Sequence, residues 1–375
     1  MRVLQIVPEL GAGGVERTAR DIARALIAAG HQAFAASAGG PLADEIAEMG
    51  GVHYTLPLAS KNPFVWRQSA ARLAEIIRDQ KIDIVHARSR APARPALWAA
   101  RKTGAKFITT YHGIYNANGP LKRRYNSIMA RGEVVIANSE YTKAHIIKEH
   151  GIAADKITAI ARGVDLAAFP EQVSDPRKAA LRAHWGASPN ERVLLLPGRL
   201  TRWKGQIPAI RAMEGVKDLT LVVQGDAQGR CAYAAELSAL MKTVEARILI
   251  APPHNDMAAA YAASFGVLSA STDPEAFGRV TAEGCAMGKP VIATAHGGTL
   301  EILDVDPVTG RSALGLLVVP GDIASLNAQI TRLAAMSQAE ADSFAAAAQR
   351  RARRLFTNSA MCAATLEVYR RVIDE

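Results

Sequence analysis

Short apolar segments alternate with amphipathic segments along nearly the whole sequence, and this alternation constrains the fold more than any other feature. Buried parallel strands are predicted at RVLQIV, IDIVHA, AKFITTY and EVVIAN in the first half, and at RVLLLP, LTLVVQG, ARILIA, FGVLSAS and KPVIAT in the second, with a further strand at QAFAASAGG after the first. After the first run, Val15, Ile22 and Leu26 share one helical face, and Gly30 ends that pattern. Strands that alternate with helices predict parallel sheets covered on both faces, so we expect an α/β fold.

The length of 375 residues exceeds that of a single hydrophobic core, which predicts two domains. The periodic pattern lapses and prolines gather over residues 165–192, and we place the domain boundary near residue 170. We therefore expect two doubly wound, Rossmann-like domains, residues 1–170 and 171–357. Such domains bind ligands outside the carboxyl ends of their strands and in the cleft between them, so binding residues are expected in loops that follow strands.

The composition is ordinary for a soluble globular enzyme, with 49% hydrophobic and 21% charged residues. The start, MRVLQIVPEL, suits a buried strand better than an export signal, and every apolar stretch falls short of the roughly 20 residues that span a bilayer. The three cysteines, Cys231, Cys285 and Cys362, show no metal-ligand spacing, and their odd number argues against a disulfide framework. We therefore predict a cytoplasmic protein.

The formal net charge of +10 predicts an anionic partner, which could be nucleic acid, a membrane surface or a phosphate-bearing substrate. Basic residues cluster at Lys122–Arg124 and at Arg350–Arg354. Each cluster is equally compatible with a solvated helix face. Charge alone leaves these alternatives open.

Three loops after predicted strands carry candidate binding residues. The first, Gly11–Arg17, is glycine-rich, and glycines let backbone N–H groups approach an anion at a helix N-terminus. It is not a dinucleotide fingerprint, because Glu16 occupies the place of the third glycine. A tight turn is the alternative interpretation.

The second loop, PGRLTRWKG, brings Arg199 and Lys204 close to a strand end, flanked by Gly198 and Gly205. Two cations held together suit a diphosphate, because each neutralises part of the phosphate charge without a metal. A surface role is the alternative for either residue alone.

The third loop, PEAFGRVTAEG, leads from a strand into a short helix. The free N–H groups of Gly278, Arg279 and Val280 would point at an anion, assisted by the helix dipole. Carboxylates accept hydrogen bonds and so suit hydroxyl groups, which predicts Glu283 on a ribose and Glu275 near a sugar. The pattern indicates a nucleotide-sugar site, and the alternative is that both glutamates are ordinary helix-start acids.

Several motifs together resemble those of the family-four retaining glycosyltransferases of GT-B fold, in which two Rossmann-like domains face a central cleft. They are, in chain order, GGVER, YHG, NSEYTK, ARGVDLAAF, PGRLTRWKG, VVQGD, PEAFGRVTAEGCAMGKPVIAT, GGTLEIL and GLLVVPGD. Their order and spacing match over nearly the whole chain, and the pair of glutamates with Phe-Gly after the first is quite specific. Two positions depart from the usual pattern: Arg162 stands where an asparagine often precedes Gly163, and Arg279 stands where an apolar residue is common.

The resemblance implies a role for each matching residue. Arg199 and Lys204 would bind the donor diphosphate, and His112 would lie near the transferred sugar, although a structural role is the alternative for a lone histidine. His296 is a further candidate for the same cleft. The predicted catalytic residues are His112, Arg199, Lys204 and Glu275. The predicted donor-binding residues are Gly13, Gly14, Gly198, Arg247, Ile248, Phe277, Gly278, Arg279, Val280 and Glu283, with the base recognised by the backbone around Arg247 and Ile248.

The resemblance further implies transfer with retention at the anomeric carbon. We expect attack on the same face, with the leaving phosphate helping to remove the acceptor proton and domain closure excluding water. Asp304 and Asp306 superficially resemble a metal-binding D-x-D motif, but their polar loop predicts a turn. Other acidic residues and histidines lack metal spacing, so we predict no essential metal and no cofactor besides the donor substrate.

Donor and acceptor are expectations that rest on charge and on the resemblance. GDP-mannose and UDP-glucose are the leading donors. The acceptor should meet the first domain, where Lys122, Arg123 and Arg124 suit an anionic saccharide or a lipid-linked envelope glycan such as a lipopolysaccharide core, and suit the inner face of the cytoplasmic membrane. The resemblance also implies that the last helix, residues 358–375, crosses back to the first domain. The alternatives are a GT-B epimerase or phosphorylase, and a basic nucleic-acid-binding protein, for which the sequence shows no recognised motif.

Overall fold

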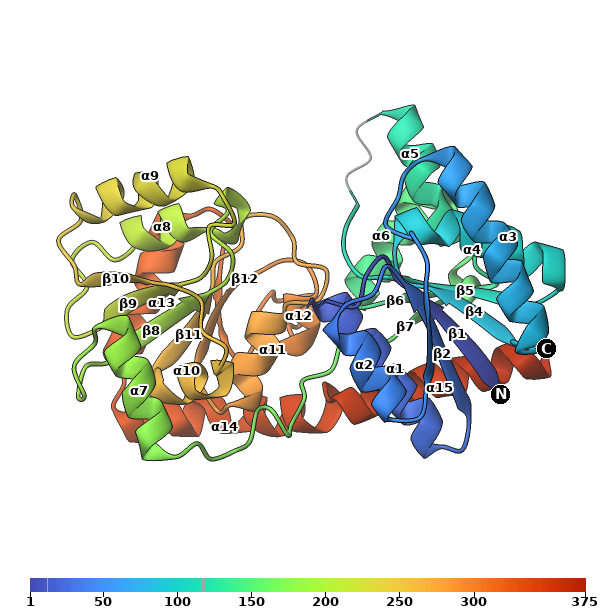
Figure 1. Ribbon diagram of the computed structural model, residues 1–375. Helices are drawn as coiled ribbons and strands as arrows, with labels where there is room; N and C mark the ends of the chain where they lie inside the picture. Colours follow the sequence, from blue (N-terminus) through green and yellow to red (C-terminus); the bar gives the residue numbers. More distant parts are fainter. Residues whose placement is uncertain (12, 116–118) are drawn as a thin grey trace. The chain divides into compact units, whose positions relative to one another are not determined.

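The computed structural model describes residues 1–11, 13–115 and 119–375. These residues form two units, which Figure 1 colours along the sequence. Unit 1 consists of Met1–Arg162 together with Asn358–Glu375, and unit 2 consists of Gly163–Thr357.

The division into units falls after Arg162 rather than near residue 170. A parallel β-bridge joins Val164 to Thr357, and the Val164 N–H donates to the Phe356 carbonyl at 2.8 Å. These contacts attach the beginning of the proline-rich segment to the end of unit 2. A lapse in periodicity does not reveal such a contact, because its two partners are far apart in the sequence.

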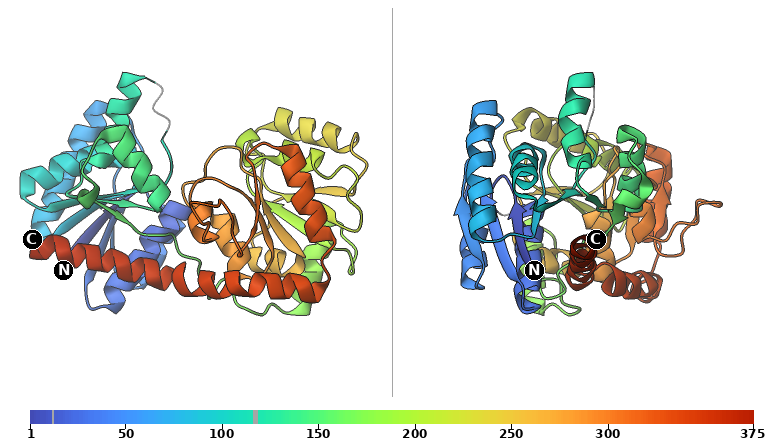
Figure 2. Two further views of the ribbon diagram at one scale, coloured as in Figure 1. Left: turned by 180° about the vertical axis from the view of Figure 1, so that it is seen from behind. Right: turned by 90° about the vertical axis from the view of Figure 1, so that its right-hand side faces the viewer.

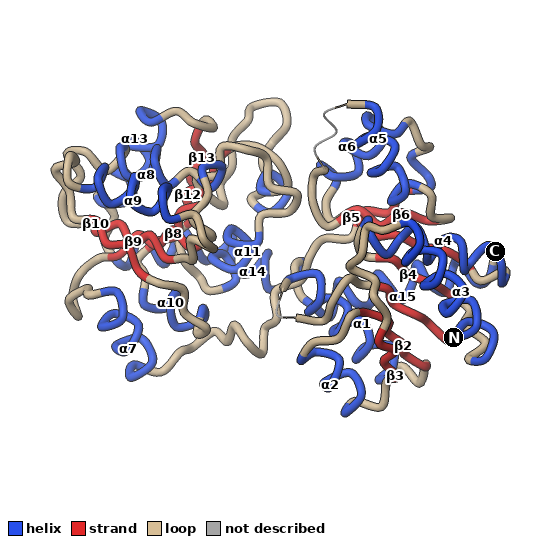
Figure 3. Tube along the Cα trace, turned by 45° about the horizontal axis from the view of Figure 1, so that its top comes forward, coloured by secondary structure: helices blue, strands red, loops and turns tan. Residues whose placement is uncertain are grey.

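Unit 1 is built on a parallel sheet with the strand order β3-β2-β1-β4-β5-β6-β7, and strands are drawn in red in Figure 3. Its strands are β1 Arg2–Ile6, β2 Gln32–Ser37, β3 Val52–Thr55, β4 Ile84–Ala87, β5 Lys106–Tyr111, β6 Val134–Ala137 and β7 Ile157–Ala159. Because β1 and β4 are neighbours and the chain builds outward from both, the topological switch point lies at their carboxyl ends.

Helices cover both faces of the sheet in unit 1. They are α1 Gly14–Ala28, α2 Pro41–Glu48, α3 Pro63–Asp79, α4 Arg90–Thr103, α5 Pro120–Asn126, α6 Glu140–His150 and α15 Asn358–Asp374, with short 3₁₀ helices η1 Ser127–Ala130 and η2 Ala154–Lys156. Leu4 and Val85 belong to the buried cluster that includes α3 and α4, whereas Val3 and Ile84 belong to the cluster that includes α1 and α15. Side chains alternate between faces along a strand, so each strand supplies both cores.

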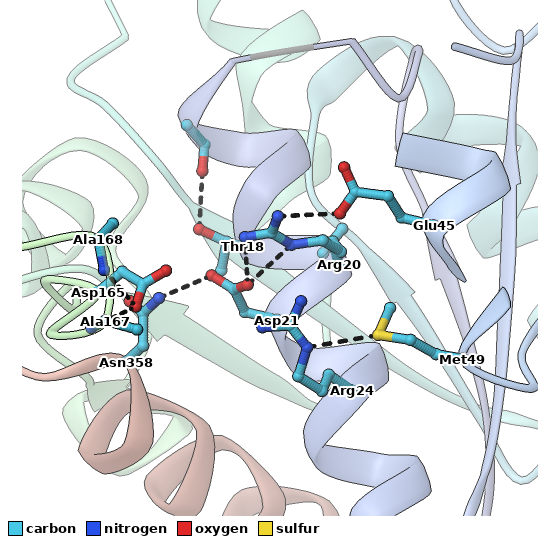
Figure 4. A network of polar contacts seen from close by, with 12 residues as sticks. Thr18, Arg20, Asp21, Arg24, Glu45, Met49, Asp165, Ala167, Ala168 and Asn358 are labelled. Atoms are coloured by element: carbon cyan, nitrogen blue, oxygen red, sulfur yellow. Dashed lines mark hydrogen bonds and ion pairs between the residues drawn. The ribbon is translucent and has the colours of Figure 1, made fainter. Parts of the chain in front are cut away.

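A polar network fixes the C-terminal helix α15 on unit 1 (Figure 4). Asn358 Nδ2 donates to Asp21 Oδ2 at 2.9 Å, and Arg20 forms ion pairs with Asp21 at 2.8 Å and with Glu45 at 3.0 Å. Deeper in the unit, the Tyr369 hydroxyl lies 2.6 Å from His86 Nδ1. The C-terminal helix therefore belongs to the first unit, as the resemblance implied.

Unit 2 is built on a second parallel sheet, with the strand order β10-β9-β8-β11-β12-β13. Its strands are β8 Val193–Pro197, β9 Thr220–Gln224, β10 Ile248–Ala251, β11 Gly266–Ser269, β12 Val291–Thr294 and β13 Leu316–Val318. Its helices are α7 Asp175–Trp185, η3 Arg202–Lys204, α8 Gln206–Arg211, α9 Cys231–Met241, α10 Met257–Ala263, α11 Arg279–Ala286, α12 Thr299–Ile302, α13 Ile323–Ala334 and α14 Gln338–Leu355 (Figure 2). Leu194, Leu221 and Ile330 belong to its main buried cluster.

The two parallel sheets with their helices confirm the predicted α/β, Rossmann-like fold class. Three strands lie outside the runs that the sequence indicated, namely β3, β7 and β13, and each has only three or four residues. All three are edge strands with partly exposed residues, so they need not carry the continuous apolar run of a strand that is buried on both faces. Within the described residues, no helix is both long and apolar enough to cross a membrane.

Candidate functional site

A cavity of about 330 Å³ lies at the carboxyl ends of strands β8, β9 and β10 in unit 2, where a doubly wound domain binds its ligand. It contains five of the predicted site residues, together with others that the sequence analysis did not single out. Its lining consists of Pro197, Gly198, Arg199, Gln224, Gly225, Asp226, Pro253, His254, Met257, Tyr261, Arg279, Val280 and Glu283.

Glu283 is a buried carboxylate in this cavity, and both of its oxygens are already held. Oε1 accepts from Arg279 Nη2 at 2.7 Å, and Oε2 accepts from the Tyr261 hydroxyl at 2.9 Å. Burial, together with the charge of Glu283, raises the pKa of Tyr261 well above its ordinary value, so this hydroxyl stays a donor. Each oxygen retains a lone pair, so Glu283 is oriented and still able to accept from a ligand hydroxyl.

The helix that carries Glu283, α11, begins at Gly278, which has a φ of 100°. A side chain there would be strained, and its Cβ would lie 2.8 Å from Thr299 Oγ1. Arg279 and Val280 are the first residues of the helix, so their N–H groups lack partners within the helix. The Phe277 side chain is buried against Phe356, with ring centroids 5.8 Å apart, which leaves only its backbone for a ligand.

Lys204 and Glu275 form a close ion pair, with Lys204 Nζ 2.5 Å from Glu275 Oε1. Ser271 Oγ donates to the same carboxylate oxygen at 2.6 Å, and both charged side chains are only 14% exposed. Gly205, at a φ of 75°, ends the turn that carries Lys204, and a Cβ there would overlap the Ala270 carbonyl. This close backbone approach positions Lys204 beside the loop that holds Glu275, which precedes α11 rather than lying in it.

Arg199 is the cation of this site that is left for a ligand. It is exposed, lines the cavity and forms no ion pair with any residue that the structure describes. His296 is not among the residues that line this cavity, and its Nε2 lies 2.7 Å from the Ser271 carbonyl. His296 therefore supports the loop that carries Glu275.

Arg247 and Ile248 do not line the cavity, which corrects the prediction that the base is recognised there. Strand β10 begins at Ile248, so both residues lie at the amino end of the sheet. Arg247 forms an ion pair with Glu191 and donates to the Gly186 carbonyl at 3.1 Å. The residues that follow β10 at its carboxyl end, Pro253 and His254, line the cavity instead.

His112 lies at the carboxyl end of β5 in unit 1. Its Nδ1 is 2.9 Å from Arg162 Nη1, whereas its Nε2 is buried and has no partner among the described residues. Burial and the positive charge of Arg162 hold the pKa of His112 well below its ordinary value, so the ring is neutral. The predicted glycines Gly13 and Gly14 lie where α1 begins, with Gly13 at the N-cap.

The basic cluster Lys122, Arg123 and Arg124 lies on α5 and is exposed. Arg123 forms an ion pair with Glu149 at 2.8 Å, and Leu121 beside it is 83% exposed. The cluster at Arg350–Arg354 is partly structural, because Arg351 pairs with Asp304 and Arg353 pairs with Glu171.

The two aspartates of the D-x-D-like loop contact other parts of the chain, and Asp304 forms an ion pair with Arg351 at 2.9 Å. Asp306 Oδ1 accepts from the N–H groups of Val308 and Thr309, which is the turn that the sequence predicted. No group of three or more histidine, cysteine, aspartate or glutamate side chains is placed to hold a metal within residues 1–11, 13–115 and 119–375.

Comparison with known proteins identifies the family. The family described as Glycosyltransferase Family 4 matches residues 12–168, and Glycosyl transferases group 1 matches residues 177–351. A crystal structure of a glycosyltransferase from Rickettsia africae is 33% identical, with a TM-score of 0.87 over 99% of this chain and 98% of that one. The chain belongs to the family-four glycosyltransferases of GT-B fold.

Two further relatives of this glycosyltransferase carry names that describe a ligand or an activity. HepE from Anabaena, solved in complex with UDP-glucose, shares the fold at 23% identity and a TM-score of 0.80, over 98% of this chain and all of that one. A D-inositol 3-phosphate glycosyltransferase from Xylanimonas cellulosilytica is 31% identical over 228 residues. That match covers 58% of this chain and only 54% of the relative.

Two arginines distinguish this glycosyltransferase from the usual family pattern, and each contacts a predicted site residue. Arg279 pairs with Glu283, and Arg162 donates to His112. The sequence marked both positions as departures, but it did not indicate their partners. Tyr261 was missed as well, although it is the only aromatic residue in helix α10 and follows a site strand.

Proposed function

We propose that this chain is a retaining glycosyltransferase that moves a hexose from a nucleotide sugar to a saccharide acceptor. The observation that carries the proposal is the content of the unit 2 cavity, where the oriented carboxylate of Glu283 lies with Arg199 and the first turn of α11. A carboxylate suits the vicinal hydroxyls of a ribose, and a cation beside a helix N-terminus suits phosphate. A nucleoside diphosphate presents both groups at once.

The donor would be held by unit 2. Glu283 accepts from the ribose hydroxyls, while Arg199 and the N–H groups of Arg279 and Val280 bind the diphosphate. Lys204 adds positive charge and Glu275 accepts from the sugar, both from the loops that their ion pair already fixes. As the bond to the donor phosphate breaks, these groups stabilise the charge that develops on the leaving diphosphate.

We propose that the anomeric carbon is attacked on the face from which the diphosphate leaves. The bond between this carbon and the phosphate oxygen breaks, a bond to the acceptor oxygen forms on the same face, and the acceptor proton passes to the departing phosphate oxygen. Configuration is thereby retained. The cations and the helix N-terminus supply the charge stabilisation, so the proposal includes no essential metal and no cofactor.

UDP-glucose and GDP-mannose are the donors that we propose to test first. The Anabaena protein HepE was solved with UDP-glucose, which places this donor at the head of the panel. Pro253 and His254 are the residues of the cavity that we propose lie against the base, because they follow the strand next to β9 at the sheet edge.

The acceptor that we propose is an anionic polyol or saccharide bound by unit 1. The relatives named D-inositol 3-phosphate glycosyltransferase have an acceptor of that chemistry in their name. Exposed Lys122, Arg123 and Arg124 on α5 suit a phosphate-bearing acceptor, including a lipopolysaccharide core or another envelope glycan. With Leu121 exposed beside them, they also suit attachment of a cytoplasmic enzyme to the anionic inner face of the membrane.

One experiment tests the function as a whole. The purified chain is incubated with a panel of sugar nucleotides, with inositol phosphate and core oligosaccharides as acceptors, and products are identified by mass spectrometry. The proposal predicts release of nucleoside diphosphate together with a glycosylated acceptor of retained configuration, and activity that survives EDTA. An altered sugar nucleotide formed without an acceptor would indicate an epimerase, and binding of nucleic acid without any turnover would exclude the transferase.

A further inference from the structure

Arg162 contacts a hydroxyl, an imidazole and a backbone carbonyl at the carboxyl edge of the unit 1 sheet. Its Nη1 donates to Thr18 Oγ1 at 2.6 Å and lies 2.9 Å from His112 Nδ1, and its Nη2 donates to the Gly14 carbonyl at 3.0 Å. Thr18 Oγ1 in turn donates to the same carbonyl at 2.8 Å. The guanidinium therefore ties His112 to the first turn of α1 and fixes the direction in which its ring points.

The chemistry of the guanidinium decides the direction of its hydrogen bond to His112. Arginine has donors only and stays charged, so Nδ1 of His112 accepts. A neutral imidazole whose Nδ1 accepts carries its proton on Nε2. The surroundings favour this neutral form, because burial and the nearby Arg162, Arg88 and His86 all lower the pKa of His112.

The proton on His112 Nε2 has nothing to bind within the described residues. Nε2 is buried, and none of the described residues accepts from it. Buried donors in native proteins almost always have a partner, and one without a protein partner indicates a place for a ligand acceptor. The vacant position calls for an oxygen with a free lone pair.

We propose that Arg162 is a positioning residue that makes His112 a permanent hydrogen-bond donor to a hydroxyl oxygen of the transferred sugar, and that His112 is not a general base. The proposal rests on the transferase function proposed above. Nε2 already carries its proton and Nδ1 faces a guanidinium, so neither nitrogen is available to take the proton of the acceptor hydroxyl. That proton goes to the departing phosphate oxygen.

The protonation state of His112 is testable on the free protein without any substrate. In protein labelled with ¹⁵N-histidine, the two ring nitrogens of His112 report the tautomer, and the resonances are assigned by their loss in His112→Gln. We expect the Nε2-protonated form throughout the range from about pH 5 to pH 8. We expect Arg162→Leu to populate both neutral tautomers, because the donor that fixes Nδ1 as an acceptor is gone while burial still keeps the ring neutral.

The matched control is Arg78→Leu, which removes an exposed arginine of α3 in the same unit and should leave the His112 resonances unchanged. A cationic ring or an Nδ1-protonated ring in the unmodified protein would overturn the proposal. This measurement requires no active assay, so it separates the role of Arg162 from the proposed transferase function.

Kinetics then distinguish a donor from a base. Glutamine at position 112 places an amide N–H near the position of Nε2, whereas asparagine places it near Nδ1, and neither is a base. We expect His112→Gln to keep kcat within about tenfold, and His112→Asn and Arg162→Leu to lower it about tenfold to a hundredfold without changing the affinity for UDP. Equal and larger losses in both His112 variants, with a basic limb lost from the pH–rate profile, would make His112 a base and refute the proposal.

Discussion

The candidate site residues of the two units differ in charge: those of unit 2 are mostly charged side chains joined in ion pairs, whereas the candidate histidine of unit 1 is neutral. In unit 2 two pairs of site charges are joined in advance, Lys204 with Glu275 and Arg279 with Glu283, whereas Arg199 has no ion pair with any described residue. In unit 1 a neutral histidine is held by a cation, and its outward N–H has no described partner.

The functions that we propose for the two units would account for this difference. A leaving diphosphate carries several negative charges, so its site needs cations whose positions are fixed before the ligand arrives, and ion pairs fix them. A neutral sugar hydroxyl needs a directed donor, and a charged histidine would add desolvation cost without benefit. If the ion pairs of unit 2 hold the donor-binding residues in place, changes that disturb those pairs should weaken donor binding or transfer.

The largest expected effect comes from adding a side chain at Gly205, where the backbone lies against the Ala270 carbonyl and so brings Lys204 beside Glu275. Gly205→Ala forces a side chain into the Ala270 carbonyl at a φ of 75°, so we expect a loss of about 3 kcal/mol or more in the free energy of unfolding and the loss of UDP binding. Gly215→Ala is the matched control, with a φ of 73° and nothing within 4 Å of the added Cβ. It should cost only about 1–2 kcal/mol. Denaturant unfolding measures the stability of the two variants, and calorimetry measures their binding of UDP. Equal losses in Gly205→Ala and Gly215→Ala would show that the contact with Ala270 is not important.

The next effect tests the ion pair itself. In Glu275→Gln, Lys204 loses its counter-charge and the sugar loses a carboxylate acceptor. We expect transfer to fall about a hundredfold, a transition-state loss of about 2.7 kcal/mol, while UDP binds as tightly as before or more tightly. Glu236→Gln is the control, because it removes an exposed partner of the neighbouring Arg202. A parallel loss of UDP affinity in Glu275→Gln would show that Glu275 does not act on the sugar.

A smaller effect tests the orientation of Glu283. Tyr261→Phe removes a hydroxyl donor at 2.9 Å from the carboxylate without changing the packing of the ring. Loss of such a bond costs about 0.5–1.5 kcal/mol, so we expect UDP to bind about threefold to tenfold more weakly. Tyr233→Phe is the control, since its hydroxyl donates to Gln206 at 3.0 Å and it does not line the cavity. Calorimetry showing no difference between the two variants would mean that Tyr261 only supports the fold.

The smallest expected effect concerns the basic cluster on α5. Lys122→Glu with Arg123→Glu should raise KM for an anionic acceptor a few-fold and weaken binding to anionic vesicles, both in a salt-dependent way, because exposed charges are screened. Arg101→Glu with Lys102→Glu changes the same charge at an exposed position of α4 and is the control. Unchanged acceptor kinetics and vesicle binding would return the α5 cluster to a solvated helix face.

Much of the fold followed from the sequence, because long apolar runs of four to six residues are distinctive in buried parallel strands. The sequence likewise pointed to Arg199, which closely follows strand β8, and to Glu283, which lies in the helix that follows β11. The exact residues at which a strand begins and ends are harder to predict from an apolar run in the sequence. Arg247 was placed in the site although β10 begins after it, so it lies at the opposite edge of the sheet.

Contacts between distant segments explain what the sequence could not supply. Tyr261 reaches Glu283 from the preceding helix, and Arg162 reaches His112 across 50 positions of the chain. Neither pair has a spacing that a local pattern records. The same holds for the Val164–Phe356 contact, which moves the boundary of the units.

The most direct test of the central claim is whether Glu283 contacts ribose hydroxyls. Calorimetry measures UDP and 2′-deoxy-UDP against the unmodified chain and Glu283→Gln. We expect the unmodified chain to bind UDP about tenfold or more tightly than 2′-deoxy-UDP, and Glu283→Gln to bind both ligands at the weaker affinity. That coupling would place the ribose on Glu283. The contrary result is that Glu283→Gln still binds 2′-deoxy-UDP more weakly than UDP by the same factor as the unmodified chain. In that case Glu283 does not hold the ribose and the proposed donor site is wrong.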